Sequence, residues 1–351
     1  MGSLDELPTP CLLLDRARLE ANCARMRAIA ARHGVRLRPH LKTAKSIEVA
    51  RLALGDASFR AGTVSTLEEA AYFAERGLGD LTYAVGITPA KLDRVAALPA
   101  GARVGVLTDD VRVARAIAAH PARFDAWIEI DSGQHRGGVA PEDPRLIEIG
   151  RALASGPRVA LRGVLTHAGH SYGGRGPGEL AVVAEEERRA AVRAAERLRE
   201  AGIECPEVSV GSTPTAVHAR SLEGVTELRA GVYVFGDLFQ AAIGTCTVDD
   251  IAVSVLASVV SRREGHAWID AGALALTQDR SLDALGGGYG EVRDLALGPL
   301  PGAPRVDALH QVHGRVVATE GSLRGLEVGA RVRVLPNHAC LTAAMFDRYY
   351  V

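Results

Sequence analysis

The segment Leu161-Arg-Gly-Val-Leu-Thr166 has the composition of a short strand, Glu179–Ala201 that of a long helix, and Glu207-Val-Ser-Val210 that of a second strand. Gly202 follows the helix directly, and glycine is common at this position because it tolerates the left-handed conformation that ends many helices. Strands that alternate with helices are typical of a parallel sheet, since the helix returns the chain to the same end of the sheet. Residues 161–210 therefore predict an α/β fold.

The same alternation extends from about residue 36 to residue 236. The other candidate strands are Val35–His40, Ala57–Thr63, Leu81–Val85, Arg103–Leu107, Ala126–Asp131 and Glu227–Phe235. The other candidate helices include Thr66–Arg76, Pro89–Leu98 and Arg145–Ala154, and Thr66-Leu-Glu-Glu69 has the spacing of a capping box. About eight β/α repeats is the number found in a closed (β/α)8 barrel of the TIM type. An open doubly wound sheet is the alternative, because strand order cannot be deduced from one sequence.

The pattern changes after about residue 245. Segments rich in β-branched residues follow one another between Gly and Pro turns: Val248–Ser261, His266–Asp270, Ala308–Ala318 and Arg331–Leu335. This pattern predicts an all-β second domain. We place the barrel at residues 10–240 and the β-domain at residues 241–351. Residues 1–14, of which 10–14 are strand-like, could add a strand to the β-domain.

Composition limits the classes of partner. Lys and Arg number 41 against 42 Asp and Glu, and only 4% of residues are aromatic, which argues against nucleic-acid binding and favours a small-molecule partner. The strongest apolar run, residues 251–260, is too short to cross a membrane. Five scattered cysteines and the lack of a secretory signal at the N-terminus are typical of reduced thiols, so we expect a cytoplasmic protein.

The first predicted strand ends in Arg38-Pro-His-Leu-Lys42-Thr-Ala-Lys45. The working residues of a β/α barrel lie at the C-terminal ends of its strands, which is where Lys42 stands. Neighbouring positive charge makes the neutral, nucleophilic form of a lysine more accessible. Lys42 is therefore a candidate nucleophile, and the alternative is a basic loop exposed to solvent.

Further polar segments follow other strands of the predicted barrel. They are Asp131-Ser-Gly-Gln-His-Arg136, Thr166-His167-Ala-Gly-His-Ser-Tyr172, Gly211-Ser212-Thr213-Pro-Thr215 and Arg229-Ala-Gly231-Val-Tyr233. Loops after the seventh and eighth strands are the usual phosphate site of this fold, where Gly, Ser and Thr supply backbone N–H groups and hydroxyls. One such loop is a common turn, but two in this location favour a phosphate-binding site.

In the second domain, Pro336-Asn-His338-Ala-Cys340 suggests a metal site. If this segment is extended, residues two positions apart point the same way, and the imidazole of His338 and the thiolate of Cys340 converge. This nitrogen and sulfur pair suits zinc better than magnesium or manganese. Two ligands leave coordination positions for water or substrate, as a catalytic zinc requires. His313 could be a third ligand or a nearby base, or an ordinary structural residue.

Together, these segments resemble the D-serine dehydratase and D-threonine aldolase family, the alanine-racemase-like fold type III of pyridoxal-phosphate (PLP) enzymes. The likeness runs from Thr9-Pro10 to the C-terminus. It implies that Lys42 carries PLP and removes the α-proton of the substrate, and that Arg229 faces the pyridine nitrogen. The remaining cofactor contacts implied by the resemblance are Arg136 and His167 for the ring, and Ser212, Thr213, Gly231 and Tyr233 for the phosphate. It also implies a homodimer, with each active site near the interface between one subunit's barrel and the other's β-domain.

The dehydratase branch of the family carries His-x-Cys where the aldolase branch carries His-x-Asp, so His338 and Cys340 favour the dehydratase branch. The predicted reaction converts a D-3-hydroxy amino acid, such as D-serine or D-threo-3-hydroxyaspartate, to an oxo acid and ammonia. Zinc would help the β-hydroxyl to leave. A metal-dependent D-threonine or 3-hydroxy-D-amino-acid aldolase is the main alternative, and an amino-acid racemase or a non-catalytic PLP carrier are others. Ala44 replaces a histidine usual in the family, and His310-Gln-Val-His313 replaces acidic residues, so the substrate stays open.

Overall fold

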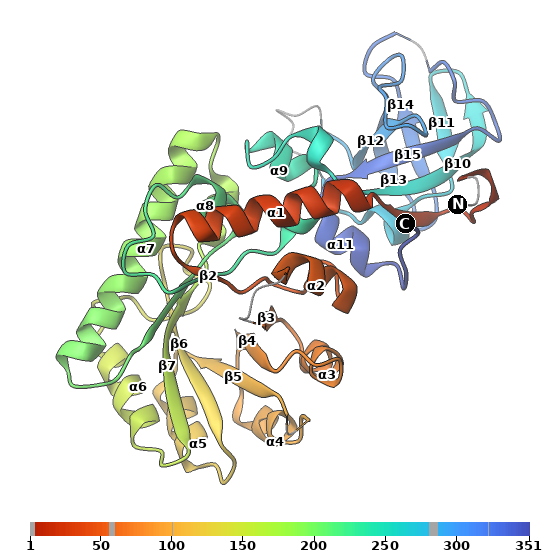
Figure 1. The fold of residues 1–351 in the computed structure, drawn as a ribbon. Helices are drawn as coiled ribbons and strands as arrows, with labels where there is room; N and C mark the ends of the chain where they lie inside the picture. Colours follow the sequence, from red (N-terminus) through yellow and green to blue (C-terminus); the bar gives the residue numbers. More distant parts are fainter. Residues whose placement is uncertain (1–3, 56–59, 100, 281–286, 322) are drawn as a thin grey trace. The chain divides into compact units, whose positions relative to one another are not determined.

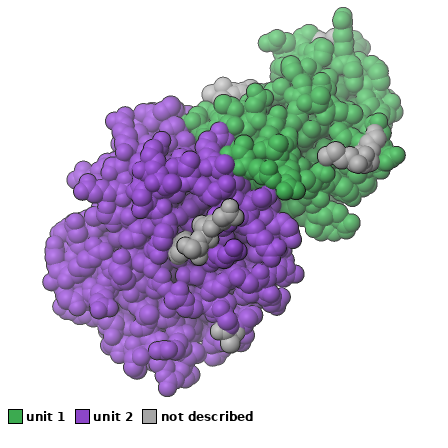
Figure 2. Space-filling view, viewed as in Figure 1, with its two compact units in different colours: residues 1–22, 232–351 green, residues 23–231 purple. Residues whose placement is uncertain are grey.

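The computed structural model describes residues 4–55, 60–99, 101–280, 287–321 and 323–351. The chain forms two compact units, one of residues 23–231 and the other of residues 1–22 with 232–351 (Figure 2). The division thus falls within helix α1 (Arg16–Arg32) and after residue 231, whereas the sequence places the barrel at 10–240. Among the described residues, no helix is long and apolar enough to cross a membrane.

The unit of residues 23–231 is built on a parallel sheet with strand order β2-β9-β8-β7-β6-β5-β4-β3. Its strands are β2 (Arg36–Leu37), β3 (Ala61–Val64), β4 (Asp80–Gly86), β5 (Arg103–Thr108), β6 (Phe124–Ile130), β7 (Val159–Thr166), β8 (Glu207–Val210) and β9 (Glu227–Leu228). A parallel bridge between His40 and Thr63 joins the two ends of this order. The predicted eight-stranded barrel is confirmed, and the open doubly wound sheet is excluded.

Helices follow the strands and lie on the outer face of the sheet (Figure 1). They are α2 (Ile47–Leu54), α3 (Leu67–Glu75), α4 (Leu92–Ala96), α5 (Val111–Ala119), α6 (Arg145–Ala154), α7 (Pro177–Glu200) and α8 (Thr213–His218). At the start of α3, the hydroxyl of Thr66 accepts from the backbone N–H of Glu69 at 3.0 Å, as predicted. The Glu69 carboxylate instead accepts from Ser65, one residue before the predicted partner, at 2.7 Å.

Some strands are shorter than predicted. β2 ends before Pro39, which has no N–H to donate to a ladder. β9 covers two residues of the predicted Glu227–Phe235 strand, and the 3-10 helix η4 (Val232–Val234) replaces its end. Of the predicted Ala57–Thr63 strand, residues 57–59 lie outside the described residues, and β3 begins at Ala61.

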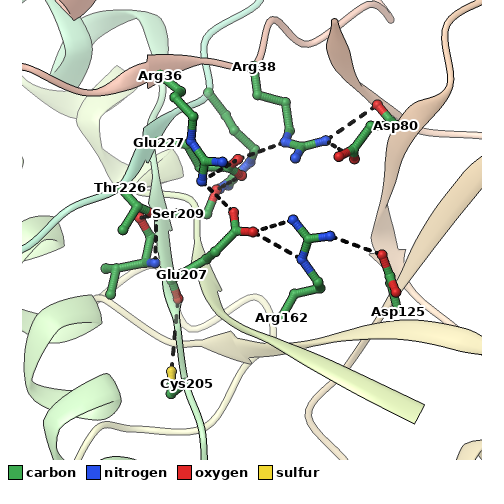
Figure 3. Close-up of polar contacts among 12 residues, drawn as sticks. Arg36, Arg38, Asp80, Asp125, Arg162, Cys205, Glu207, Ser209, Thr226 and Glu227 are labelled. Carbon is green, nitrogen blue, oxygen red and sulfur yellow. Dashed lines mark hydrogen bonds and ion pairs between the residues drawn. The ribbon is translucent and has the colours of Figure 1, made fainter. Parts of the chain in front are cut away.

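Charged side chains from several strands form a network within this unit (Figure 3). The Arg38 side chain has 0% exposure and donates to Glu227 at 2.9 Å and to Asp80 at 2.7 Å. Arg162 joins Glu207 to Asp125 in the same way. Buried charges are tolerated only when they are paired, so this network ties together strands that are distant in sequence.

The other unit is an antiparallel sheet. Its strands are β1 (Cys11–Leu14), β10 (Val253–Arg263), β11 (His266–Ile269), β12 (Gly290–Arg293), β13 (Arg305–Leu309), β14 (Gly314–Val317) and β15 (Arg331–Pro336). The order is β1-β10-β11-β14-β13-β12-β15, and a further pairing of β10 with β15 closes a ring. The predicted all-β second domain is confirmed. The long β10 makes closure possible, because Val255 and Leu256 pair with β1 on one edge and with β15 on the other.

Two features of the antiparallel unit differ from the prediction. The single strand predicted at Ala308–Ala318 is a hairpin of β13 and β14, with the exposed residues His310–His313 in its turn. β12 was not predicted, because it has four residues and begins with a glycine. The short helices α9 (Leu238–Ala242), α10 (Ala273–Leu276) and α11 (Ala339–Ala344) complete the unit.

Candidate functional site

Basic side chains gather where several strands of the barrel end. Lys42 follows β2 and is exposed, His167 follows β7, and Arg229 follows β9. The charges of Lys42 and Arg229 act on both His40 and His167, and the charge of Arg136 acts on His167. The structure therefore brings together residues that the sequence places on four different loops.

Both histidines of this group are held in the neutral form. The pKa of His167 is lowered to about 4, chiefly by burial; a hydrogen bond to Gly211 opposes this shift, and the charges of Arg136, Arg229 and Lys42 add to it. That bond joins His167 Nδ1 to the carbonyl oxygen of Gly211 at 3.0 Å, so Nδ1 carries the proton and Nε2 is the acceptor. Burial also holds the pKa of His40 well below its usual value.

Hydrogen bonds fix the side chain of Arg229 within this group. Its guanidinium donates to Ser209 Oγ and to the carbonyl oxygen of Thr166, each at 2.6 Å. Ser209 Oγ in turn donates to Glu227 at 2.6 Å, and Glu227 is paired with Arg38 (Figure 3). Burial lowers the pKa of Arg229 to about 10, with Glu227 and Glu187 opposing it, so the side chain is cationic at neutral pH.

The loop after β8 is tightly packed. Gly211 has φ of +138°, and a Cβ there would lie 2.0 Å from the carbonyl oxygen of Arg229, so only glycine fits. A Cβ on Gly231 would lie 3.1 Å from both the Cβ and the oxygen of His40. Neighbouring protein atoms therefore fill the space beside both glycines, and a side chain at either position would displace the loop.

Ser212 is occupied within the protein. Its N–H donates to Thr215 Oγ1 at 3.0 Å, its hydroxyl accepts from Thr215 N at 3.2 Å, and Ser171 Oγ lies 2.9 Å from the same hydroxyl. The hydroxyl therefore fixes the start of α8. Thr213 is the buried first residue of α8. Tyr233 lies in the other unit, where it is buried in η4.

Arg136 lies in an exposed loop that two carboxylates hold in place. Asp131 Oδ1 accepts from the N–H groups of Gly133 at 2.9 Å and His135 at 3.1 Å. Asp109 accepts from Gly138 N at 2.7 Å. The loop is thus ordered at both ends, while the Arg136 side chain remains accessible to a ligand.

This group of residues fits an anionic aromatic cofactor such as PLP. Three cationic side chains and two neutral imidazoles offer donors and acceptors. Thr63, next to His40 in the sheet, has a buried hydroxyl with no hydrogen-bond partner in the described part of the chain. The donors suit a phosphate and a phenolate oxygen better than a neutral ligand.

In the antiparallel unit, His338 and Cys340 lie at the start of α11. His338 is the N-cap residue, with φ of −135° and ψ of 99°, and α11 begins at Ala339. The segment is therefore extended only as far as His338, because the helix starts between the two residues. Their side chains nevertheless form a hydrogen bond with each other.

Two carboxylates that the sequence did not indicate hold this turn. Asp279 Oδ2 lies 2.5 Å from His338 Nδ1. Asp237, the N-cap of α9, accepts from Ala339 N at 3.0 Å and from Gln240 N at 2.8 Å. Asp279 and His338 are 59 residues apart, so no local spacing could have linked them.

The groups around His338 raise the pKa of its imidazole. Burial alone would lower the pKa of His338, but hydrogen bonding and charge from Cys340, followed by Asp279 and Asp237, raise it to about 9. Burial raises the pKa of Asp237 to about 6. A site that stabilises positive charge in this way is suited to a cation.

The described ranges contain no group of three or more His, Cys, Asp or Glu side chains arranged to hold a metal. His313, in the exposed turn between β13 and β14, therefore does not complete a three-ligand site with His338 and Cys340. The pair offers one nitrogen and one sulfur donor, with Asp279 positioned on the other nitrogen of the imidazole. A carboxylate there orients a metal-binding histidine in many zinc sites.

Two family models match the chain. Residues 14–238 match the alanine racemase N-terminal domain, and residues 252–351 match a putative serine dehydratase domain. Together the two matches cover nearly the whole chain, and each falls largely within one of the two structural units.

Relatives that match nearly the whole chain are named as dehydratases and aldolases. The D-threo-3-hydroxyaspartate dehydratase of Delftia sp. (strain HT23) is 45% identical over 98% of this chain and 93% of its own length. A D-threonine aldolase of Arthrobacter sp. is 31% identical over 98% of this chain and 89% of its own length. A solved structure of a cysteine-to-alanine variant of D-threo-3-hydroxyaspartate dehydratase, in the metal-free form, superposes with a TM-score of 0.94 at 43% identity, covering 99% of this chain and 95% of that one.

Proposed function

We propose that this chain, which belongs to the alanine-racemase-like family of PLP-dependent lyases of fold type III, is a zinc-dependent dehydratase of D-3-hydroxy amino acids. D-threo-3-hydroxyaspartate and D-serine are the proposed substrates, and an oxo acid and ammonia are the products. The observation that carries this proposal is the His338–Cys340 pair in a chain that is 45% identical to a D-threo-3-hydroxyaspartate dehydratase.

The barrel residues would hold PLP. Lys42 is the proposed attachment point, Arg136 and His167 the contacts to the ring, and Arg229 the partner of the pyridine nitrogen. We assign the phosphate to the backbone at Gly231 and to Ser212, Thr213 and Tyr233, on the sequence motif. Because the hydroxyl of Ser212 already caps α8, its contribution would require that hydroxyl to be shared. Bound PLP supplies an electron sink for bond cleavage at the α-carbon.

The protein side chains would then move one proton. The amine of Lys42 removes the α-proton of the substrate, as the resemblance implies. His167 cannot donate from Nε2, since its pKa of about 4 and its bond to Gly211 leave that nitrogen unprotonated. Arg229 remains cationic and would donate a hydrogen bond to the pyridine nitrogen without protonating it.

The His338–Cys340 pair would hold zinc. Thiolate and imidazole favour zinc over the harder ions magnesium and manganese. Zinc with only two protein ligands has free positions and supplies a Lewis acid for a departing hydroxyl. The relative that is metal-free was solved as a cysteine-to-alanine variant, which supports a cysteine ligand in that enzyme.

The test of the reaction is one incubation of the purified protein with D-serine, D-threonine and D-threo-3-hydroxyaspartate, with and without a chelator. We expect oxo acid and ammonia, and we expect both to disappear when the metal is removed and to return with added zinc. Glycine and an aldehyde would instead support an aldolase, the activity named for the Arthrobacter relative. Equal rates with and without the chelator would contradict the role of zinc.

We further propose that the protein is a homodimer in the cytoplasm. Within the described ranges, no disulfide joins any of the five cysteines, which fits a reducing compartment. If each active site uses the barrel of one subunit and the metal pair of the other, mixed dimers of Lys42→Ala and His338→Ala subunits contain one intact site. Mixing the two inactive variants would then restore part of the activity, and no recovery would argue that each subunit works alone.

A further inference from the structure

Glu187 is a buried acidic residue in helix α7. It lies near the middle of α7 with 2% of its surface exposed, while its neighbour Glu186 is exposed. The residues beside it on the buried face of the helix are the alanines Ala184, Ala191 and Ala194. Burial raises the pKa of the Glu187 carboxyl, so keeping it here is costly unless it is well hydrogen-bonded.

The carboxylate binds the two loops that carry the proposed PLP residues. Glu187 Oε1 accepts from Ala168 N at 2.8 Å and from Gly211 N at 3.1 Å. Ala168 directly follows His167, and Gly211 directly precedes Ser212. One oxygen atom of α7 therefore joins the loop after β7 to the loop after β8.

Among the described strands, no pairing joins these two loops. β7 and β8 pair at Gly163–Leu165 with Glu207–Ser209, and the loops continue beyond that ladder. His167 Nδ1 donates to the oxygen of Gly211, so both backbone groups of Gly211 are bound, one by His167 and the other by Glu187. The side chain of Glu187 also bonds Thr215, the residue that caps α8 together with Ser212.

We propose that Glu187 is a positioning residue that clamps the loops after β7 and β8 in the geometry that binds PLP. This inference rests on the proposed PLP site and deepens it. Glu187 reaches the site only through the backbone of Ala168 and Gly211. Its reach and its acceptor oxygen matter here, and its charge does not.

Two conservative variants separate the effect of the length of the Glu187 side chain from the effect of its charge. Glu187→Gln keeps the length of the side chain and an acceptor oxygen for both N–H groups, and its amide can donate to Thr215. Glu187→Asp keeps the charge but is one methylene shorter, so two buried N–H groups lose their acceptor. Glu186→Ala is the matched control, since it removes an exposed carboxylate one position away on the same helix.

The experiment measures two quantities for each variant. The first is the hydrogen-exchange rate of the Ala168 and Gly211 amides in the full-length protein without PLP. The second is the dissociation constant of PLP, measured by absorbance on adding PLP to the same protein. We expect Glu187→Asp to exchange these two amides at least about 10-fold faster and to bind PLP about 10-fold more weakly, while Glu187→Gln and Glu186→Ala stay within about 3-fold of the wild type.

Either of two results would overturn the clamp. One is Glu187→Gln weakening PLP binding as much as Glu187→Asp does or more, which would make the charge of Glu187 decisive through its attraction to Arg229. The other is unchanged amide exchange in Glu187→Asp. A protein that binds no PLP in any form would refute the proposed function instead, and the exchange rates would still judge the clamp.

Discussion

The two units offer their candidate residues in different ways. In the parallel barrel, Lys42, His167 and Arg229 come from loops after three different strands, and they meet because parallel strands end at one edge. In the antiparallel unit, His338 and Cys340 come from a single turn at the start of α11. The barrel therefore assembles its site from the whole topology, whereas the metal pair depends on one local structure.

The means of support differ accordingly. Arg229 is fixed through Ser209 and Glu227 to the buried charge of Arg38, so its position depends on several strands. The turn of His338 is held by hydrogen bonds that Asp237 and Asp279 accept. A change in the barrel should thus disturb stability and cofactor binding together, while a change near α11 should affect metal binding alone.

The test with the largest expected effect on this difference between the units replaces one site residue in each unit. Lys42→Ala should lower kcat at least about 10³-fold, since it removes both the attachment point and the base, and should leave the zinc content unchanged. Cys340→Ala should lose zinc but retain PLP, measured by atomic emission and by absorbance. Lys45→Ala serves as the control, because it lies in the same loop and keeps both groups. Loss of PLP from Cys340→Ala would show that the two units do not bind their groups independently.

The next largest effect concerns the buried ion pair. Glu227→Ala removes one carboxylate partner of the buried guanidinium of Arg38. We therefore expect the free energy of unfolding of the barrel to fall by about 3–5 kcal/mol. The exposed Glu223→Ala should change it by less than about 0.5 kcal/mol. Urea denaturation followed by hydrogen exchange would show whether the loss is confined to the barrel, and a change of stability in the antiparallel unit of similar size would contradict the contrast.

The pH dependence of stability provides a third test. His167 has a folded pKa of about 4, below the unfolded value near 6.5, so its contribution to stability is present above pH 6.5 and is lost as the pH falls toward 4. The loss should be on the order of 3 kcal/mol for the PLP-free protein. His167→Gln should remove this part of the pH dependence, measured by denaturation at pH 7 and pH 4.5. An equal pH dependence of stability in the variant and the wild type would show that His167 is not the group responsible.

A smaller effect is expected beside the metal pair. Asp237→Asn keeps one acceptor oxygen for Gln240 and loses the one for Ala339 N, so the turn that carries His338 and Cys340 loosens. We expect zinc affinity to fall about 10–100-fold and PLP affinity to stay the same, measured by competition with a chelating dye. Asp249→Asn, on an exposed carboxylate of the same unit, is the control. Weakened PLP binding in Asp237→Asn would show that zinc binding and PLP binding are not independent.

Much of the barrel could be predicted from the sequence, because its strands are short apolar runs between well-marked helices. Helix α6 coincides with the predicted Arg145–Ala154, where apolar residues recur at helical spacing. The length of β2 was overestimated although Pro39, which cannot donate to a ladder, is visible in the sequence. The length of β9 was overestimated because the composition of residues 229–235 resembles that of a strand, whereas η4 forms there. β12 and the hairpin at His310–His313 were missed because short strands carry too little periodicity.

The candidate site was predicted unevenly. The residues in the motifs around Lys42, His167 and Gly211 lie together, because strand ends are visible in the sequence. Two supporting residues were not found: Glu187, which binds the barrel loops, and Asp279, which binds His338. Each acts at long range in the sequence, so neither belongs to a local pattern; an acidic residue on the alanine face of a long helix was the only available signal for Glu187.

We propose that the barrel carries PLP on Lys42, independently of the metal pair. Borohydride reduction of the PLP-loaded protein, followed by peptide mapping, identifies the labelled lysine directly. We expect a pyridoxyl label on Lys42 in the wild type and equally in a zinc-free His338→Ala variant. A label on Lys45, or a label on Lys42 that disappears in His338→Ala, would contradict it.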